Sequence, residues 1–219
     1  MSSEADGLRE TARSYFAEYD PGPAHDWHHV ERVKALADRL AAGREADGRK
    51  IDERVLHAAV LLHDIGRGRE DAGEIEDHAA WGASETRDVL GEREGFDAER
   101  TEAVAHAIRA HRYSNDVEPE TVEARLLSDA DNLDALGAIG IARVFAYGGE
   151  TGTPIHDPDR PVEADDSPAG ETGTNHLRKK ILALPERMYT DRGREVAEQR
   201  RAFVEDFLER LEAEATGDR

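Results

Sequence analysis

Apolar residues recur at helical spacing along this sequence, and this pattern constrains the fold more than any other feature. Val30, Val33, Ala37 and Leu40 lie three or four residues apart, which predicts an amphipathic helix over 28–42. The same periodicity predicts further helices over 52–65, 78–91, 98–112, 119–146 (as one helix or two) and 191–215. No segment alternates apolar and polar residues over about five positions, as a half-buried strand does. The sequence therefore predicts an all-α fold.

Two segments stand out from this pattern. Residues 52–65 begin at Asp52, a plausible N-cap, and Gly66 and Gly68 after them predict the end of the helix. The segment is apolar on most sides, which is typical of a buried helix. Residues 148–175 are rich in Gly, Pro, Asp and Thr and have no periodicity. A loop this long inside a compact domain is usually functional or mobile. We expect a flexible acidic loop or a lid there, as an irregular insertion before the C-terminal helices.

Length and composition bound the remaining possibilities. A chain of 219 residues is long for one domain and short for two, so we expect a single domain over 1–219. No apolar run approaches the roughly 18 residues of a membrane span, and the first residues lack the basic and apolar regions of a secretory signal. Cysteine is absent, which excludes disulfide scaffolds, thiolate zinc sites and cysteine nucleophiles. These features predict a cytoplasmic protein.

The chain is strongly acidic. Asp and Glu number 49 against 29 Lys and Arg, for a formal net charge of −20. Such a surface repels nucleic acid backbones and anionic membranes, so we expect neither a nucleic acid polymer nor a membrane as partner. The acidic residues are spread along the chain, unlike an acidic tail, and the regular apolar stripes argue against disorder. We interpret the composition as that of a halophilic protein, in which molar salt screens the self-repulsion.

One histidine–aspartate pair lies next to the buried helix. His63 and Asp64 follow the apolar pair Leu61 and Leu62, where polar side chains are costly to bury without partners. A divalent cation would satisfy both, because imidazole and carboxylate are common metal ligands. The alternative is that His63 and Asp64 cap the helix and bond each other.

Further candidate ligands occur at wide spacing in the sequence. His29 begins its own amphipathic helix, while Asp131 and Asp134 lie on or beside the buried face of a third helical segment. Two histidines and two carboxylates suit a six-coordinate ion such as manganese, iron, cobalt, nickel or magnesium.

The order His29, His63-Asp64, Asp131 resembles the signature of the HD superfamily of metal-dependent phosphohydrolases. The local sequences are similar as well: HDWHHVERV (25–33), LLHDIGRG (61–68), DADNLDALGAIGIARVFAYGG (129–149) and NHLRKK onward (175–215). The last two resemble a subgroup of small single-domain HD hydrolases. The resemblance covers about residues 20–215. It implies a compact helical HD-type domain, a divalent ion (Mn, Ni, Co or Mg) on those four residues, and hydrolysis of a phosphoester or phosphoanhydride, on a small nucleotide.

The sequence departs from two patterns within the superfamily. The GYP-type motif of cyclic-dinucleotide phosphodiesterases does not occur. Binuclear members have two more histidines before the last Asp, for which His78, His106 and His111 are candidates. Because His106 and His111 are five residues apart, about 140° round a helix, both cannot easily face one ion. We therefore predict one metal ion. His106 or His111 could instead meet the substrate, while a core role for His111 and a helix-terminal role for His78 stay open.

The resemblance also suggests roles for individual residues. Asp64 could orient or deprotonate the attacking water, and Asp134 is the second candidate base. Phosphate oxygens need fixed positive charge, for which the candidates are Arg32, Arg67 and Lys180, each alternatively a surface charge.

Two other classes of function stay open. A non-catalytic nucleotide-binding regulatory protein would keep the pocket and lose the metal, and the presence of all four ligands argues against it. A metal-dependent oxygenase occurs in the superfamily, but it resembles the binuclear pattern.

Overall fold

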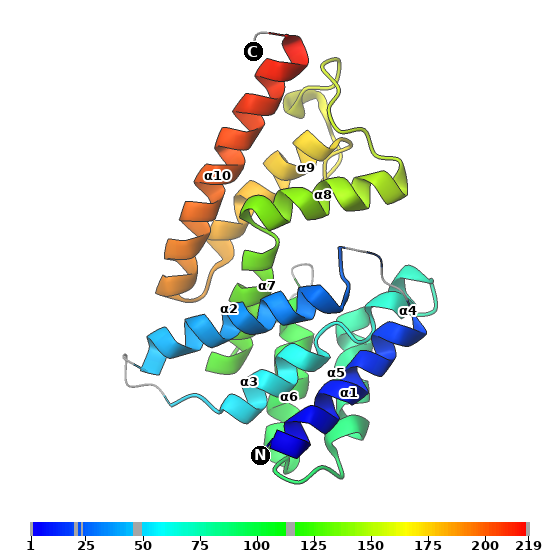
Figure 1. Ribbon diagram of the computed structural model, residues 1–219, viewed down its shortest axis with the longest axis vertical. Helices are drawn as coiled ribbons and strands as arrows, with labels where there is room; N and C mark the ends of the chain where they lie inside the picture. Colours follow the sequence, from blue (N-terminus) through cyan, green and yellow to red (C-terminus); the bar gives the residue numbers. More distant parts are fainter. Residues whose placement is uncertain (1, 20–21, 23, 46–49, 113–116, 218–219) are drawn as a thin grey trace. The chain divides into compact units, whose positions relative to one another are not determined.

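The computed structural model describes residues 2–19, 22, 24–45, 50–112 and 117–217. These residues form helices α1 to α10 and two short 3-10 helices, η1 and η2, with no β-strand in the described ranges (Figure 1). The all-α prediction is therefore confirmed. The chain divides into two compact units, Met1–Asp131 and Asn132–Arg219. One domain over the whole chain stays a prediction. None of the described helices is both long and apolar enough to cross a membrane.

The first unit is organised around α3. It contains α1 (Ser2–Glu18), α2 (Trp27–Glu45), α3 (Glu53–Leu62), α4 (Arg67–Asp71), α5 (His78–Leu90), α6 (Ala98–His111) and most of α7 (Val122–Asp134). Helix α3 contacts α1, α2 and α6, and α6 packs in turn on α5 (Figure 1). Its residues Val55, Leu56 and Ala58 to Leu62 are all buried, as its apolar sequence predicts.

Aspartate side chains cap the N-termini of three helices of this unit. Asp52, Asp77 and Asp97 each accept hydrogen bonds from backbone N–H groups in the first turn of α3, α5 and α6. These N–H groups have no partner inside their own helix, so each cap stabilises the helix by about 1 kcal/mol. The predicted N-cap at Asp52 is confirmed, and Gly91 ends α5 where the sequence predicts a helix end.

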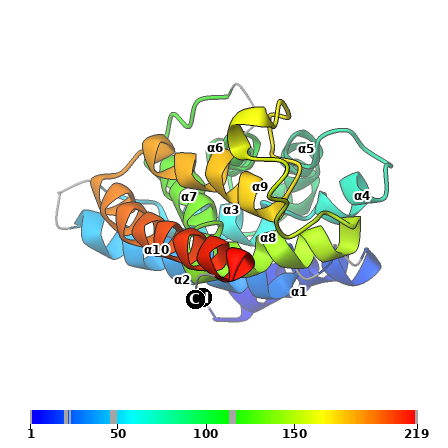
Figure 2. The same cartoon turned by 90° about the horizontal axis from the view of Figure 1, so that it is seen from above.

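The second unit contains α8 (Gly137–Thr151), η1 (Val162–Ala164), α9 (Gly173–Lys179), η2 (Ile181–Arg187) and α10 (Asp191–Thr216). Helix α10 packs along α8 and η2, and α9 contacts both α8 and η2. Both helices can be followed in Figure 2, α8 in green and α10 in orange and red. Helix α10 buries Gly193, Ala197, Val204 and Leu208, whereas Phe203 is exposed. The rings of Phe145 on α8 and Phe207 on α10 lie 6.0 Å apart.

The predicted irregular insertion at 148–175 is shorter in the structure. Helix α8 continues to Thr151 and α9 begins at Gly173, so irregular backbone, interrupted only by η1, covers 152–172. The N–H of Gly173 donates to the carbonyl of Pro154 at 2.8 Å, which closes the loop at its base.

A buried carboxylate organises this loop. The Asp165 side chain accepts hydrogen bonds at 2.7–3.0 Å from Ser167, Glu171 and Asn175, and it pairs with Lys179 at 3.2 Å. Burial raises the pKa of Asp165, but these donors lower it by more, so the carboxylate is ionised at neutral pH. The loop therefore has a defined internal structure, and its role as a lid stays a prediction.

Candidate functional site

Side chains from three helical segments of the first unit converge on one point. His29 lies in the first turn of α2, His63 and Asp64 follow α3, and Asp131 lies in the last turn of α7. His29 Nε2 is 3.2 Å from His63 Nε2, 3.4 Å from Asp131 Oδ1 and 3.6 Å from Asp64 Oδ2. His63 Nε2 is 3.7 Å from the same oxygen of Asp64. The structure thus brings together all four predicted ligands, which we call the His–Asp cluster.

The spacing of these donor atoms suits a divalent ion. Neighbouring ligand atoms that each lie about 2.1 Å from one ion are about 3 to 3.5 Å apart. The four distances given above run from 3.2 to 3.7 Å. Nitrogen and oxygen ligands in equal number fit a borderline or hard ion of the first transition row, or magnesium.

The protonation of His63 also fits a metal ligand. Its Nδ1–H donates to the carbonyl of Val60 at 2.8 Å, and a carbonyl can only accept. In the neutral imidazole the lone pair is therefore on Nε2, the atom that faces the cluster. Burial lowers the pKa of His63 to about 4, so the neutral form is the one present at pH 7.

Asp64 carries negative charge in a buried place. Asp64 is only 5% exposed, and this burial by itself raises the pKa of its carboxyl group. In the acid range where His63 becomes protonated, its charge lowers the pKa of Asp64, and hydrogen bonds from the imidazoles of His111 and His78 lower it further. Together they hold the pKa of Asp64 well below its ordinary range. The carboxylate is therefore ionised and available to a cation.

The other oxygen of Asp64 faces a second pair of histidines. His78 Nε2 lies 3.3 Å and His111 Nε2 lies 3.5 Å from Asp64 Oδ1. His111 is buried on the apolar stripe of α6, which agrees with the core role considered for it, and its Nδ1–H donates to the carbonyl of Ile108. Its ring is thus both a core side chain and a neighbour of the cluster.

His106 has a different environment. Its Nε2 accepts a hydrogen bond from the backbone N–H of Glu120 at 3.0 Å. The side chains of His106 and His111 therefore point in different directions, as their spacing predicts. The second imidazole at Asp64 Oδ1 is that of His78, the first residue of α5.

Asp26 and Gly66 position parts of this site. The Asp26 carboxylate accepts a hydrogen bond from the N–H of His29 at 3.0 Å, in the manner of a helix N-cap. A Cβ atom added at Gly66 would lie 2.9 Å from the backbone oxygen of His78 and 2.9 Å from the ring of Trp81. Only glycine lets the turn after Asp64 approach α5 so closely.

The predicted phosphate-binding and base residues occupy varied places. Arg32 follows His29 by one turn of α2. Arg67 Nε donates to both carboxylate oxygens of Asp71 at 3.1 Å. Lys180, directly after α9, and Asp134 belong to the second unit. Asp134 is buried and pairs with Arg143 at 2.9 Å.

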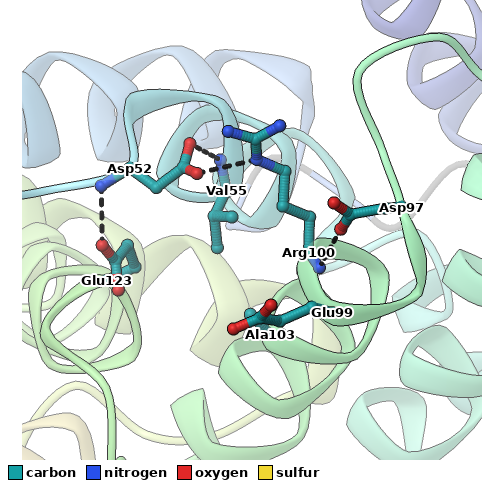
Figure 3. Close-up of a pocket in the computed structure, with 7 residues that line it drawn as sticks. All are labelled: Asp52, Val55, Asp97, Glu99, Arg100, Ala103 and Glu123. Carbon is teal, nitrogen blue, oxygen red and sulfur yellow. Dashed lines mark hydrogen bonds and ion pairs between the residues drawn. The ribbon is translucent and has the colours of Figure 1, made fainter.

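A pocket of about 330 Å³ lies elsewhere in the first unit, and none of the predicted site residues lines it. Figure 3 shows the Asp52 carboxylate beside Arg100, at 2.8 Å, and the Glu123 carboxylate accepting from the Asp52 N–H, also at 2.8 Å. Asp97 and Glu99 complete a lining with four carboxylates and one guanidinium. Most of these acids lie at helix N-termini, where the helix dipole stabilises negative charge. The pocket therefore repels anionic ligands.

Sequence reasoning missed two residues that lie behind His78. Glu70 and Arg112 form an ion pair at 2.7 Å, and Glu70 contacts the His78 ring. The only hint in the sequence was the position of Arg112 directly after His111.

Comparisons with known proteins agree with this geometry. The HD domain family profile matches residues 26–136, a range that contains the whole His–Asp cluster. YpgQ of Bacillus subtilis (strain 168) is 30% identical over 218 residues, which cover 98% of this chain and 95% of YpgQ. The crystal structure of YpgQ in complex with ADP matches with a TM-score of 0.71 and 28% identity, over 97% of this chain and 95% of that one. An HD-superfamily hydrolase from Bacillus thuringiensis matches with a TM-score of 0.71 and 30% identity, over 98% of both chains. The resemblance noted in the sequence is confirmed, and the chain belongs to the HD domain family.

Proposed function

We propose that this protein is a metal-dependent phosphohydrolase that cleaves a phosphoester or phosphoanhydride bond of a small nucleotide. The observation that carries the proposal is the His–Asp cluster, in which His29 Nε2 lies 3.2–3.6 Å from a ligand atom of each of the other three residues. Structures of similar HD-superfamily hydrolases support a hydrolase.

His29, His63, Asp64 and Asp131 would hold one divalent ion, of manganese, nickel, cobalt or magnesium. When bound, such an ion supplies Lewis acidity, which activates a water nucleophile and neutralises charge on phosphate oxygens. The chain's own task is to keep these donors deprotonated and aimed at one point, and the lowered pKa values of His63 and Asp64 serve that task.

Asp64 is our first candidate to orient the attacking water or accept its proton. It is ionised, and its two oxygens face different imidazoles. Asp134 is the second candidate, and its carboxylate pairs with Arg143 at 2.9 Å.

Four further residues are proposed to contact the substrate: Arg32, Arg67, His111 and Lys180. The three cations would neutralise phosphate charge, which a chain with a net charge of −20 otherwise repels. His111 presents its Nε2 beside Asp64 and, in the imidazolium form, could donate from this atom to a phosphate oxygen.

The nucleotide class rests on YpgQ, which has been crystallised with ADP and covers nearly the whole of this chain. The acidic composition favours a small nucleotide over a polymer.

A hydrolysis panel tests the proposal. The purified protein is assayed with nucleoside mono-, di- and triphosphates and with single-stranded oligonucleotides, each with Mn²⁺, Ni²⁺, Co²⁺ or Mg²⁺, and the products are separated by chromatography. We expect metal-dependent hydrolysis of a small nucleotide, lost in His63→Ala. The matched control is His57→Ala, because His57 is also on α3 but pairs with Asp38 at 2.9 Å, outside the cluster. Faster turnover of oligonucleotides would refute the small-nucleotide assignment.

Two results of the same experiment would favour the alternatives. If the protein binds a nucleotide tightly but hydrolyses none with any of the four metal ions, it is a regulatory nucleotide-binding protein. Two metal ions per chain by elemental analysis would indicate a binuclear centre, with His78 and His111 as the added ligands, and would reopen the oxygenase alternative.

A further inference from the structure

His78 is held from both sides. Its Nε2 lies 3.3 Å from Asp64 Oδ1, and its Nδ1 hydrogen-bonds to Glu70 Oε2 on the opposite side of the ring. The same oxygen of Glu70 accepts the backbone N–H of His78 at 2.9 Å. His78 is only 4% exposed. A single carboxylate therefore fixes both the main chain and the ring of this histidine.

Glu70 is fixed in turn by Arg112. The guanidinium donates to Glu70 Oε1 at 2.7 Å and to Glu70 Oε2 at 3.3 Å. It also donates at 3.2 Å to Asp77, the residue that caps α5. Arg112 directly follows His111, whose Nε2 also contacts Asp64. This network ties α4, the start of α5 and the end of α6 together behind the Asp64 carboxylate.

We propose that Glu70 and Arg112 are positioning residues for the hydrolysis proposed above, and that they act through His78. By fixing the His78 ring against one oxygen of Asp64, they keep the other oxygen turned toward His29. A carboxylate that binds a metal is itself commonly held by hydrogen bonds from outer residues, and a carboxylate behind an imidazole sets the orientation of that ring. The inference rests on the proposed function, because it assigns these residues to the same site.

The chain contains a natural control for this network. Arg87 and Glu102 also join α5 to α6, with a bond of 2.6 Å, but on the surface. Their side chains are 47% and 60% exposed, against 25% and 18% for Arg112 and Glu70. Neither contacts His78 in any interaction that the structure describes.

The test is a double-mutant cycle between Glu70 and His78, read on Mn²⁺ affinity. Glu70→Ala, His78→Ala and the double variant are prepared metal-free and titrated with Mn²⁺ in a calorimeter, and kcat and KM are measured separately. We expect Glu70→Ala to raise the Kd for Mn²⁺ by about 10- to 100-fold. The double variant should bind Mn²⁺ no more weakly than His78→Ala alone, because Glu70 acts through His78.

Three further variants complete the design. Glu70→Gln keeps an oxygen that can accept from His78, so it should recover most of the affinity and fold even if Glu70→Ala does not. Arg112→Met should weaken Mn²⁺ binding in the same direction as Glu70→Ala, and Glu102→Ala should leave it unchanged. In Glu70→Ala and Arg112→Met, kcat should fall together with the Mn²⁺ affinity, while KM changes little.

Other outcomes would overturn the inference. Additive effects in the cycle would mean that Glu70 acts independently of His78. An unchanged Kd with a lower melting temperature would mean that the network only stabilises the fold. If the wild type binds Mn²⁺ but hydrolyses no nucleotide, the proposed function fails, while the cycle on Mn²⁺ affinity still decides the positioning role. A wild type that binds no Mn²⁺ would refute both.

Discussion

Removing one ligand of the His–Asp cluster should remove most of the stabilisation that a divalent ion gives to the folded protein. Asp131→Ala is the informative change, because Asp131 comes from α7 and lies 3.4 Å from His29 of α2. The cluster joins segments that are far apart in sequence, so an ion bound there holds the folded state and has no such site in the unfolded chain.

The magnitude follows from binding linkage and chain length. At free Mn²⁺ of about 100 times Kd, the folded wild type gains about 2.7 kcal/mol. For a chain of 219 residues, this corresponds to a rise in melting temperature of about 5–11 °C. If Asp131→Ala raises Kd about 100-fold, the gain at the same Mn²⁺ is about 0.4 kcal/mol, or about 1–2 °C. The metal-free variant should also lose about 1–3 kcal/mol, because the buried His29 loses an acceptor.

The assay is thermal unfolding of metal-free protein across a Mn²⁺ titration, with metal content measured by elemental analysis. Asp38→Ala is the matched control, since Asp38 also contacts a histidine, His57, at 2.9 Å but lies outside the cluster. Arg32→Ala should keep the full metal-dependent rise and lose turnover or substrate binding, because Arg32 is proposed to contact phosphate. If Asp131→Ala keeps both the metal and the rise of about 5–11 °C, the ligand assignment is wrong.

Four other predictions concern pH, packing, the loop and salt. The pKa of His63 is lowered from 6.5 to about 4, so its contribution to stability is complete above about pH 6.5 and is lost as pH falls toward 4. The difference in unfolding free energy between the metal-free wild type and His63→Gln should therefore shrink by about 3 kcal/mol over that interval; a constant difference would contradict the assignment. Gly66→Ala should lower both melting temperature and Mn²⁺ affinity, because its Cβ would lie 2.9 Å from the α5 backbone; normal affinity would show that the turn can move freely. Asp165→Ala should speed amide hydrogen exchange in the loop 152–172, and unchanged exchange would show that the carboxylate does not organise it. Melting temperature should rise from low to molar potassium chloride, and a flat or falling curve would refute the halophilic interpretation.

Helical periodicity predicted the long helices well, because each buries an apolar stripe. It missed α1, whose sequence is mostly polar and which is buried only at Leu8 and Ala12 among its described residues. It also missed α4 and α9, which have five and seven residues and are too short to show a period. Helix α9 depends on a cap, since the Thr172 side chain accepts from the N–H of Asn175.

The candidate site divides in the same way. The His–Asp cluster could be predicted because its residues lie in motifs that can be read along the chain. The neighbours of Asp64 could not, because their relation to it is tertiary. Spacing along α6 correctly separated His106 from His111, but it could not reveal that His78, from α5, would lie beside His111. The ion pair of Glu70 and Arg112 spans 42 positions of sequence and has no local signature.

These tertiary contacts explain why a two-residue motif needs so much of the first unit around it. An ionised Asp64, only 5% exposed, is stable only if both of its oxygens have partners. One oxygen faces His29 and His63, and the other faces His78 and His111. Those four imidazoles come from α2, the end of α3, α5 and α6, so packing of the helices and orientation of the carboxylate depend on each other. A substitution that shifts any of these helices should therefore reduce metal affinity before it unfolds the protein, even where it touches none of the ligands.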